Sequence, residues 1–158
     1  MTDHGRMYPV RDAAAYLAGH WIIHRTVIDE LSGTEGSFAG TAEFRPADDE
    51  LLELESGEFE WGGVTNRASR SHRLVPRADG TADVLFADGR PFHDLDLRTG
   101  HWSTRHPCAA DLYDGEFTVV ARNEWHLRWR VSGPAKTQLL TSVYRRIPST
   151  GRPPNPAA

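Results

Sequence analysis

Apolar and polar residues alternate with a period of two along most of this chain. The alternation is clearest in two segments, whose apolar positions are Trp21, Ile23 and Val27 in the first and Trp125, Leu127, Trp129 and Val131 in the second. A period of two places successive side chains on opposite faces, which is typical of a β-strand with one buried face. We therefore expect both apolar sets to point into the core.

Turn residues divide the rest of the chain into short segments of the same kind. Glycine and proline end most of these segments, and Asp88-Gly89 forms a hairpin signal. Residues 11–18 form the one exception, because Ala and Leu favour a helix and Gly19 ends it. We expect strands at residues 20–27, 36–46, 51–61, 65–75, 81–87, 91–97, 106–111, 116–122, 125–131 and 137–147.

This pattern predicts an all-β domain with a short N-terminal helix. About eight to ten antiparallel strands joined by tight turns would form a closed barrel or a sandwich. Residues 11–147 make up the predicted single domain, since no linker, repeat or low-complexity block divides them. Residues 1–10 are predicted to be a flexible arm, and residues 148–158 a disordered, proline-rich tail.

Composition excludes several classes of protein. The 18 basic and 22 acidic residues give a net charge of −4, which offers no field for nucleic acid or an anionic membrane. Cys108 is the single cysteine, so no intrachain disulfide can form. The longest apolar stretch, residues 13–23, is too short to span a membrane. We expect a cytoplasmic protein with no nucleic-acid or membrane partner, and leave a homodimer open.

Two short motifs resemble those of the lipocalin and calycin superfamily. Gly19-His20-Trp21 opens the first expected strand, and Tyr144-Arg145-Arg146 ends the last one. In that superfamily a G-x-W motif opens the first strand, and an arginine near the end of the last strand packs over the Trp ring. The resemblance implies an antiparallel lipocalin-like β-barrel in which Trp21 provides the ring and Arg145 or Arg146 provides the cation.

Almost the full length of the chain also resembles a family of uncharacterised bacterial proteins of this barrel type. The resemblance implies the fold and the size of the protein, but no activity. It is carried by Phe86-Ala-Asp-Gly-Arg-Pro-Phe-His93, His106-Pro-Cys108, Asp111-Leu-Tyr113, Trp129-Arg-Val-Ser-Gly-Pro134 and Tyr144-Arg-Arg146.

Our first functional hypothesis is a barrel that holds a small hydrophobic or amphipathic ligand, with an anionic group, in its interior. An apolar cavity with a few convergent polar groups is the usual form of such a site. A buried arginine requires an anion, and Glu53, Glu55 or Asp88 could serve as well as a ligand. The candidate ligand-binding residues are Arg70, His72, Arg90, Trp125, Trp129, Lys136, Tyr144 and Arg146.

The alternative is a small cofactor-independent enzyme of the isomerase, cyclase or lyase type. Histidine titrates near neutral pH, an aspartate can set its tautomer, and a tyrosine can donate a proton to a developing oxyanion. The candidate catalytic residues are His93, His106, Asp88, Asp111 and Tyr113.

A third hypothesis is a haem or metal carrier. His106 and Cys108 share one strand face, and His93 on a neighbouring strand could join them. The chain lacks the repeated ligand spacing of zinc fingers and metalloproteases. We therefore expect neither a metal site nor a cofactor.

Overall fold

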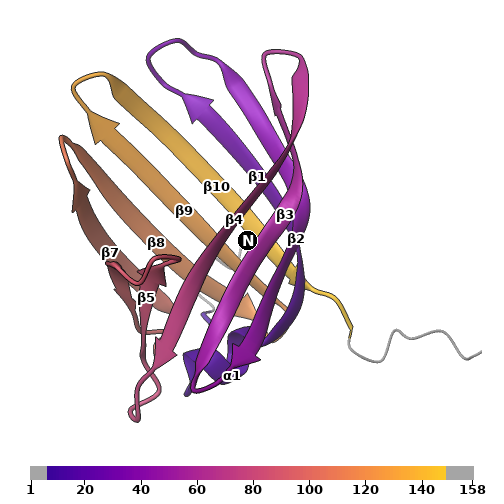
Figure 1. The fold of residues 1–158 in the computed structure, drawn as a ribbon, viewed down its shortest axis with the longest axis vertical. Helices are drawn as coiled ribbons and strands as arrows, with labels where there is room; N and C mark the ends of the chain where they lie inside the picture. The colour runs from indigo at the N-terminus through magenta and orange to yellow at the C-terminus, as the bar shows by residue number, and fades with distance from the viewer. Residues whose placement is uncertain (1–6, 149–158) are drawn as a thin grey trace, which may run out of the picture.

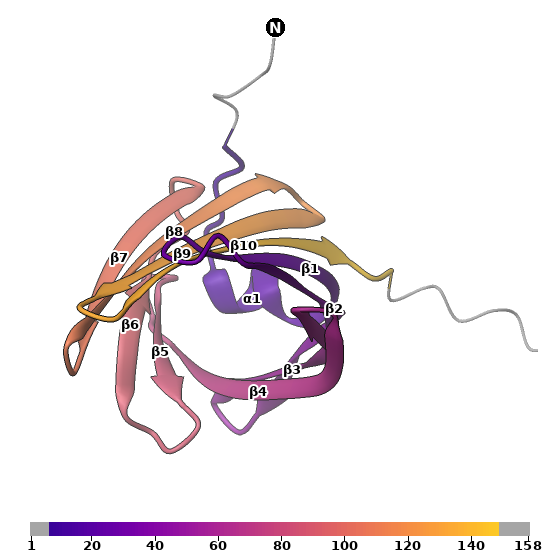
Figure 2. The same ribbon diagram turned by 90° about the horizontal axis from the view of Figure 1, so that it is seen from above.

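The computed structural model describes residues 7–148, which form one nearly closed antiparallel β-barrel (Figures 1 and 2). Strands adjacent in sequence pair with each other, except β6 and β7, and β1 also pairs with β10. This closure decides between the barrel and the sandwich. The elements are α1 (Ala13–Leu17), β1 (Gly19–Asp29), β2 (Glu35–Ala47), β3 (Glu50–Trp61), β4 (Val64–Pro76), β5 (Ala82–Phe86), β6 (Pro91–Leu95), β7 (His101–Cys108), β8 (Asp111–Ala121), β9 (Glu124–Gly133) and β10 (Lys136–Arg146).

The predicted alternation is confirmed on the first and ninth strands. The apolar residues of β9 at positions 125, 127, 129 and 131 are all buried, and the residues between them are more exposed. Trp21, Ile23 and Val27 of β1 are also buried. Arg25 has the same parity as these three residues, and it is buried with them. The core of the barrel therefore contains a charged residue of β1.

Helix α1 closes one end of the barrel (Figure 2). The Asp12 side chain caps its first turn by accepting a hydrogen bond from Ala15 N at 3.1 Å. Trp21 lies against the helix, and its indole Nε1 donates to Leu17 O at 2.8 Å. The Arg146 guanidinium lies 4.1 Å from the Trp21 ring centroid, which identifies the arginine that the superfamily resemblance left open. Arg145 instead pairs with Glu124.

The barrel wall is incomplete on one side. β5 and β6 have five residues each, so β4 pairs with β5 only over His72–Pro76. The segment 64–71 of β4 is therefore paired with β3 alone (Figure 1). Between β6 and β7 the sheet has no ladder within residues 7–148. Trp102 Nε1 and Thr104 Oγ1 instead donate to the backbone and side-chain oxygens of Asp94.

The seventh strand differs from the expectation of a strand at 106–111. It covers His101–Cys108, and its hairpin turn contains Ala109 with a positive φ of 55°. Asp111 therefore begins β8 rather than ending β7. Residues 101–105 show no apolar alternation, and their strand is held by its ladder with β8.

The start of the described chain is tied to the barrel. Tyr8 N donates to Val119 O at 2.8 Å, Val10 N donates to Leu97 O at 3.0 Å, and Val10 is buried. The rest of the predicted flexible arm, residues 1–6, lies outside the described residues, as does the predicted tail after residue 148.

No helix in residues 7–148 has the length and apolar character needed to cross a membrane.

Candidate functional site

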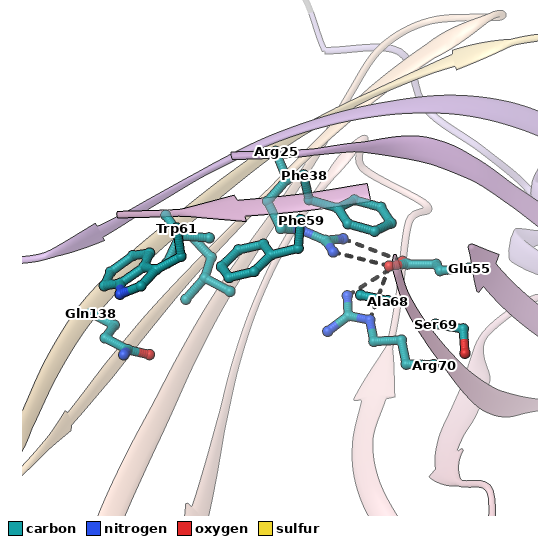
Figure 3. A pocket seen from close by; sticks show the side chains of 11 residues that line it. Arg25, Phe38, Glu55, Phe59, Trp61, Ala68, Ser69, Arg70 and Gln138 are labelled. Atoms are coloured by element: carbon teal, nitrogen blue, oxygen red, sulfur yellow. Dashed lines mark hydrogen bonds and ion pairs between the residues drawn. The ribbon is translucent and has the colours of Figure 1, made fainter. Parts of the chain in front are cut away.

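A cavity of about 460 Å³ lies inside the barrel (Figure 3). It extends toward the end opposite α1, because Trp61 ends β3 and Gln138 lies near the start of β10. Strands β1, β2, β3, β4 and β10 form its walls. The lining residues are Arg25, Val27, Phe38, Glu55, Phe59, Trp61, Ala68, Ser69, Arg70, Gln138 and Leu140.

Glu55 lies between two arginines at the inner end of this cavity (Figure 3). Arg25 Nη1 and Nη2 donate to the two Glu55 oxygens at 3.0 and 3.3 Å. Arg70 Nε and Nη2 donate to the same two oxygens at 3.0 and 3.3 Å. The side chains of Glu55 and Arg25 are only 1% and 8% exposed, whereas that of Arg70 is 39% exposed. Arg70 is therefore the arginine that a ligand can reach.

Two side chains of strand β10, Tyr144 and Ser142, complete this network. The Tyr144 hydroxyl donates to Glu55 Oε2 at 2.9 Å and accepts from Arg25 Nη2 at 2.9 Å. Arg25 Nε donates to Ser142 Oγ at 2.7 Å. Side chains from β1, β4 and β10 thus meet at the Glu55 carboxylate of β3. Because the partners of a buried charge must all be in place, this arrangement is rigid.

The two arginines keep Glu55 ionised. Burial alone would raise the pKa of Glu55, but the charges of Arg70 and Arg25 outweigh it and hold the pKa well below the ordinary range. Glu53 behaves in the opposite way: burial, together with repulsion from Glu55, raises its pKa to about 8. Burial also lowers the pKa of His72 to about 4, with Arg70 adding to the shift.

The charges at the inner end of the cavity therefore do not balance at neutral pH. Arg25 and Arg70 are positive, Glu55 is negative, and Glu53 and His72 are neutral. One positive charge remains. Within residues 7–148 the Nη1 group of Arg70 donates no hydrogen bond, so donors on this arginine are available to a ligand.

The outer part of the cavity is apolar and aromatic. Phe59 and Trp61 are near-parallel, with ring centroids 6.1 Å apart and 13° between the ring planes. The Arg25 guanidinium lies 5.3 Å from the Phe38 ring centroid. Val27 and Leu140 add aliphatic surface. A ligand here would contact aromatic rings at one end and arginine at the other.

A second, smaller cavity of about 40 Å³ lies between this network and α1. Arg70 lines both cavities, and Glu53, His72 and His93 line the smaller one. Trp125 also lines it, and its buried indole Nε1 has no hydrogen-bond partner. This inner cavity is too small for an organic ligand but has room for water.

The structure divides the predicted ligand-binding residues between several places. Arg70 lines the large cavity, and Tyr144 bonds the carboxylate at its inner end. His72, Trp125 and Trp129 line the inner cavity. Three predicted residues lie elsewhere: Arg90 pairs with Asp88 on the β5–β6 turn, Lys136 begins β10, and Arg146 lies at the closed end.

The predicted catalytic residues are not brought together as an acid–base set. Asp88 lies on an exposed turn and Asp111 at the β7–β8 hairpin. His93 Nδ1 contacts Asp94 O at 2.7 Å. His106 and Tyr113 are cross-strand neighbours with ring centroids 6.4 Å apart. In the described part of the chain, no side-chain hydrogen bond joins any two of these five residues.

The metal-carrier hypothesis required His93, His106 and Cys108 around one point. Among residues 7–148, no group of three or more His, Cys, Asp or Glu side chains is placed to hold a metal ion. Cys108 is exposed.

The sequence reasoning missed Arg25 and the aromatic wall. Arg25 could have been found from its parity, because it is two residues from both Ile23 and Val27. Phe59 and Trp61 share a face with Glu53 and Glu55 by the same rule. The sequence names Glu55 only as one of three carboxylates that could partner a buried arginine, beside Glu53 and Asp88.

Several solved structures are similar to this one, and the first of them shares its fold. An S-type phycobiliprotein lyase from Guillardia theta has 9% identity over 90% of this chain and 94% of that chain, with a TM-score of 0.60. A DUF3598-family protein of unknown function from Nostoc punctiforme has 11% identity and a TM-score of 0.50; the alignment covers 89% of this chain and 51% of that one. A de novo designed fluorescence-activating β-barrel has 17% identity over 87% of this chain and 100% of that one, with a TM-score of 0.48.

No curated protein sequence matches the chain. One family of sequences does match it, over residues 17–146, from the last residue of α1 to the last residue of β10. The chain therefore belongs to the family of unknown function DUF6314.

Proposed function

We propose that this protein binds a small amphipathic anion inside the barrel. The anionic group would contact Arg70, and the apolar part would lie against Phe59 and Trp61. One observation carries the proposal: two arginines face a single ionised carboxylate at the inner end of an apolar cavity. A cavity of about 460 Å³ is within the range that holds a drug-sized ligand.

The groups bonded to the arginines at the large cavity favour binding over acid–base catalysis. Glu53, whose pKa burial raises to about 8, lines only the inner cavity, which is too small for an organic ligand. A general base works best when its pKa lies near the operating pH. The low pKa of Glu55 makes it a weak base, and burial raises the pKa of Tyr144 so that it keeps its proton. These groups are suited to holding a fixed charge distribution, which is the requirement for recognising an anion.

Two dyes that share one ring system test this proposal. Anilinonaphthalene sulfonate carries a sulfonate, whereas N-phenylnaphthylamine is neutral, and both fluoresce on entering an apolar cavity. We expect the wild-type protein to bind the sulfonate about tenfold more tightly, which corresponds to about 1.4 kcal/mol. Arg70→Gln should remove this preference and leave the affinity for the neutral dye unchanged.

Arg73→Gln is the matched control. Arg73 lies on the same strand as Arg70 but on the opposite face, where it pairs with Glu50. This variant should bind both dyes as the wild type does. Equal affinity of the wild type for the two dyes, or an equal loss in both arginine variants, would contradict the proposal.

A cytoplasmic location, a bacterial source and a homodimer stay predictions from the sequence.

A further inference from the structure

We propose that Glu53 sets the charge of the anion site, so that the site binds its ligand while Glu53 carries a proton and weakens when that proton is lost. This inference rests on the proposed function, because it describes the regulation of the same cavity. Glu53 precedes Glu55 by two residues on β3, and both side chains point inward and are buried. Two carboxylates buried on one face of a strand repel each other, so a proton on one of them is favoured.

The arginines decide which of the two carboxyl groups is ionised. Both guanidinium groups direct their hydrogen bonds to Glu55. The nearest cation-forming atom with a direct contact to Glu53 is His72 Nδ1, at 3.9 Å from Oε2. A buried carboxyl group without an arginine partner retains its proton. Glu53 is therefore the proton carrier of the pair.

Every other titratable group around Glu53 keeps one charge state between pH 6.5 and 9. Arg25 and Arg70 stay positive and Glu55 stays negative. Burial lowers the pKa of both His72 and His93, so both are neutral, and the raised pKa of Tyr144 keeps its hydroxyl protonated. The remaining neighbours from β2 and β9, Phe44 and Trp125, do not titrate.

Loss of the Glu53 proton would therefore cancel the excess charge of the site. Arg70 lines both the ligand cavity and the inner cavity that contains Glu53, so its charge acts on both. With Glu53 protonated, one positive charge remains for a ligand. With Glu53 ionised, two carboxylates face two arginines, and an added anion has no net attraction. The pKa of Glu53, raised by burial to about 8, places this change just above neutrality.

Linkage makes the effect reciprocal. If protonation of Glu53 strengthens anion binding, then a bound anion must strengthen proton binding at Glu53 by the same factor. Binding near pH 8 should therefore take up a fraction of a proton. Binding of a ligand whose affinity does not depend on the charge of Glu53 would take up no proton.

The test measures the affinity of the full chain for anilinonaphthalene sulfonate from pH 6.5 to 9.5. The sulfonate stays ionised over this range, so any change belongs to the protein. We expect the wild-type affinity to fall about tenfold across the range, within the usual size of coupling between two sites. Glu53→Gln, which cannot ionise, should keep its pH 6.5 affinity throughout.

Two controls separate this inference from the proposed function. Glu50→Gln removes a half-buried carboxylate on the outer face of the same strand and should follow the wild-type pH profile. The neutral N-phenylnaphthylamine should bind equally at all pH values. If Glu53→Gln loses affinity with the same pH profile as the wild type, the role of Glu53 is overturned while the anion site stands. If the two dyes bind the wild type equally at pH 6.5, the anion site itself is overturned.

A second measurement does not depend on how well the variant folds. Calorimetry of sulfonate binding to the wild type at pH 8, in buffers of different ionisation enthalpy, reports the protons taken up. We expect uptake of a substantial fraction of one proton. Zero uptake would overturn the inference.

Discussion

The phenol ring of Tyr144 lies flat against the indole of Trp125, with ring centroids 3.8 Å apart and 5° between the ring planes. Both residues are buried, so the stack fixes the direction of the Tyr144 hydroxyl. That hydroxyl bonds both Glu55 and Arg25. The packed core near α1 thereby orients Glu55 and Arg25 at the inner end of the large cavity.

Tyr144→Phe tests the contribution of this hydroxyl. The stack should survive, but Glu55 loses a donor and Arg25 loses an acceptor in a buried environment. We expect the free energy of unfolding to fall by about 1–3 kcal/mol. Urea denaturation would measure it, with Tyr113→Phe as a control of small effect, because Tyr113 makes no side-chain hydrogen bond within the described residues. Equal losses in both variants would show that the hydroxyl network adds no stability.

A double-mutant cycle tests the buried ion pair. Glu55→Gln leaves two arginines without their anion, and we expect a loss of about 3–5 kcal/mol in the free energy of unfolding. Arg25→Gln should lower the free energy of unfolding less in the Glu55→Gln background than in the wild type. We expect a coupling energy of about 1–3 kcal/mol between the two residues. The half-buried pair Glu50 and Arg73 on the outer face of the barrel provides the comparison and should couple more weakly. Additive effects at Glu55 and Arg25 would contradict the network.

The pKa shifts predict how stability depends on pH. Native Glu53 holds its proton up to about pH 8, whereas the unfolded chain loses it near the ordinary glutamate pKa of 4.5. Glu53 therefore lowers stability as pH rises between these values. His72 has the opposite effect between about pH 4 and the ordinary histidine pKa of 6.5, because only the unfolded chain binds its proton there. Above pH 6.5 the Glu53 effect is uncompensated.

We therefore expect the free energy of unfolding to fall between pH 6.5 and 8, by at most about 1.4 kcal/mol per pH unit. Glu53→Gln should show no such fall. Urea titrations at several pH values would check it, and a wild-type stability that rises across this interval would contradict the assignment of the proton to Glu53.

Arg146 and Arg145 form a matched pair at the closed end of the barrel. Arg146 covers Trp21 and donates to the carbonyl oxygens of Tyr16 and Ala18, whereas Arg145 pairs with Glu124 on the surface. We expect Arg146→Ala to lower the free energy of unfolding by roughly 1–3 kcal/mol. Arg145→Ala should have little effect. If the two variants are equally stable, the contact over Trp21 does not hold the helix in place.

Trp61→Ala tests the aromatic wall of the cavity. Trp61 is partly exposed near the end of β3, so its loss should change the stability of the fold little. Both dyes share the ring system that would contact it, and we expect the affinity for each to fall about tenfold. Fluorescence titration would show this pattern, which differs from the loss for the sulfonate alone expected in Arg70→Gln. Unchanged affinity for both dyes would place them outside this cavity.

The fold was predictable because most strands carry a signal of their own in the sequence. Alternation along β1 and β9 shows which side is buried, and glycine- and proline-containing turns mark where strands end. The prediction was wrong at β7, because residues 101–105 carry polar side chains on both sides of the strand and gave no periodic signal. Their pairing with β8 depends on the neighbouring strand, which a local pattern cannot report.

The site was less predictable because its parts come from distant strands. Arg25 bonds Ser142 and Tyr144, more than a hundred residues away, and only the barrel closure of β1 against β10 brings them together. The rings of His93, His106 and Tyr113, which the catalytic hypothesis named, lie around Phe92 instead. Alternate residues of a strand face the same side, and this rule holds for charged residues as well as apolar ones. Applied to β1, it places Arg25 inside the barrel with Ile23 and Val27.

The seam between β6 and β7 is the one place in the barrel wall where neighbouring strands within residues 7–148 share no main-chain ladder. A fully laddered barrel can widen only by breaking main-chain hydrogen bonds, but at the seam between β6 and β7 the links within residues 7–148 are side-chain bonds from Trp102 and Thr104 to Asp94. Such bonds can exchange with water as the two strands separate. Opening the wall at this seam therefore breaks no ladder hydrogen bonds, whereas opening the α1 end would break the contacts of Arg146 with Trp21 and with the helix.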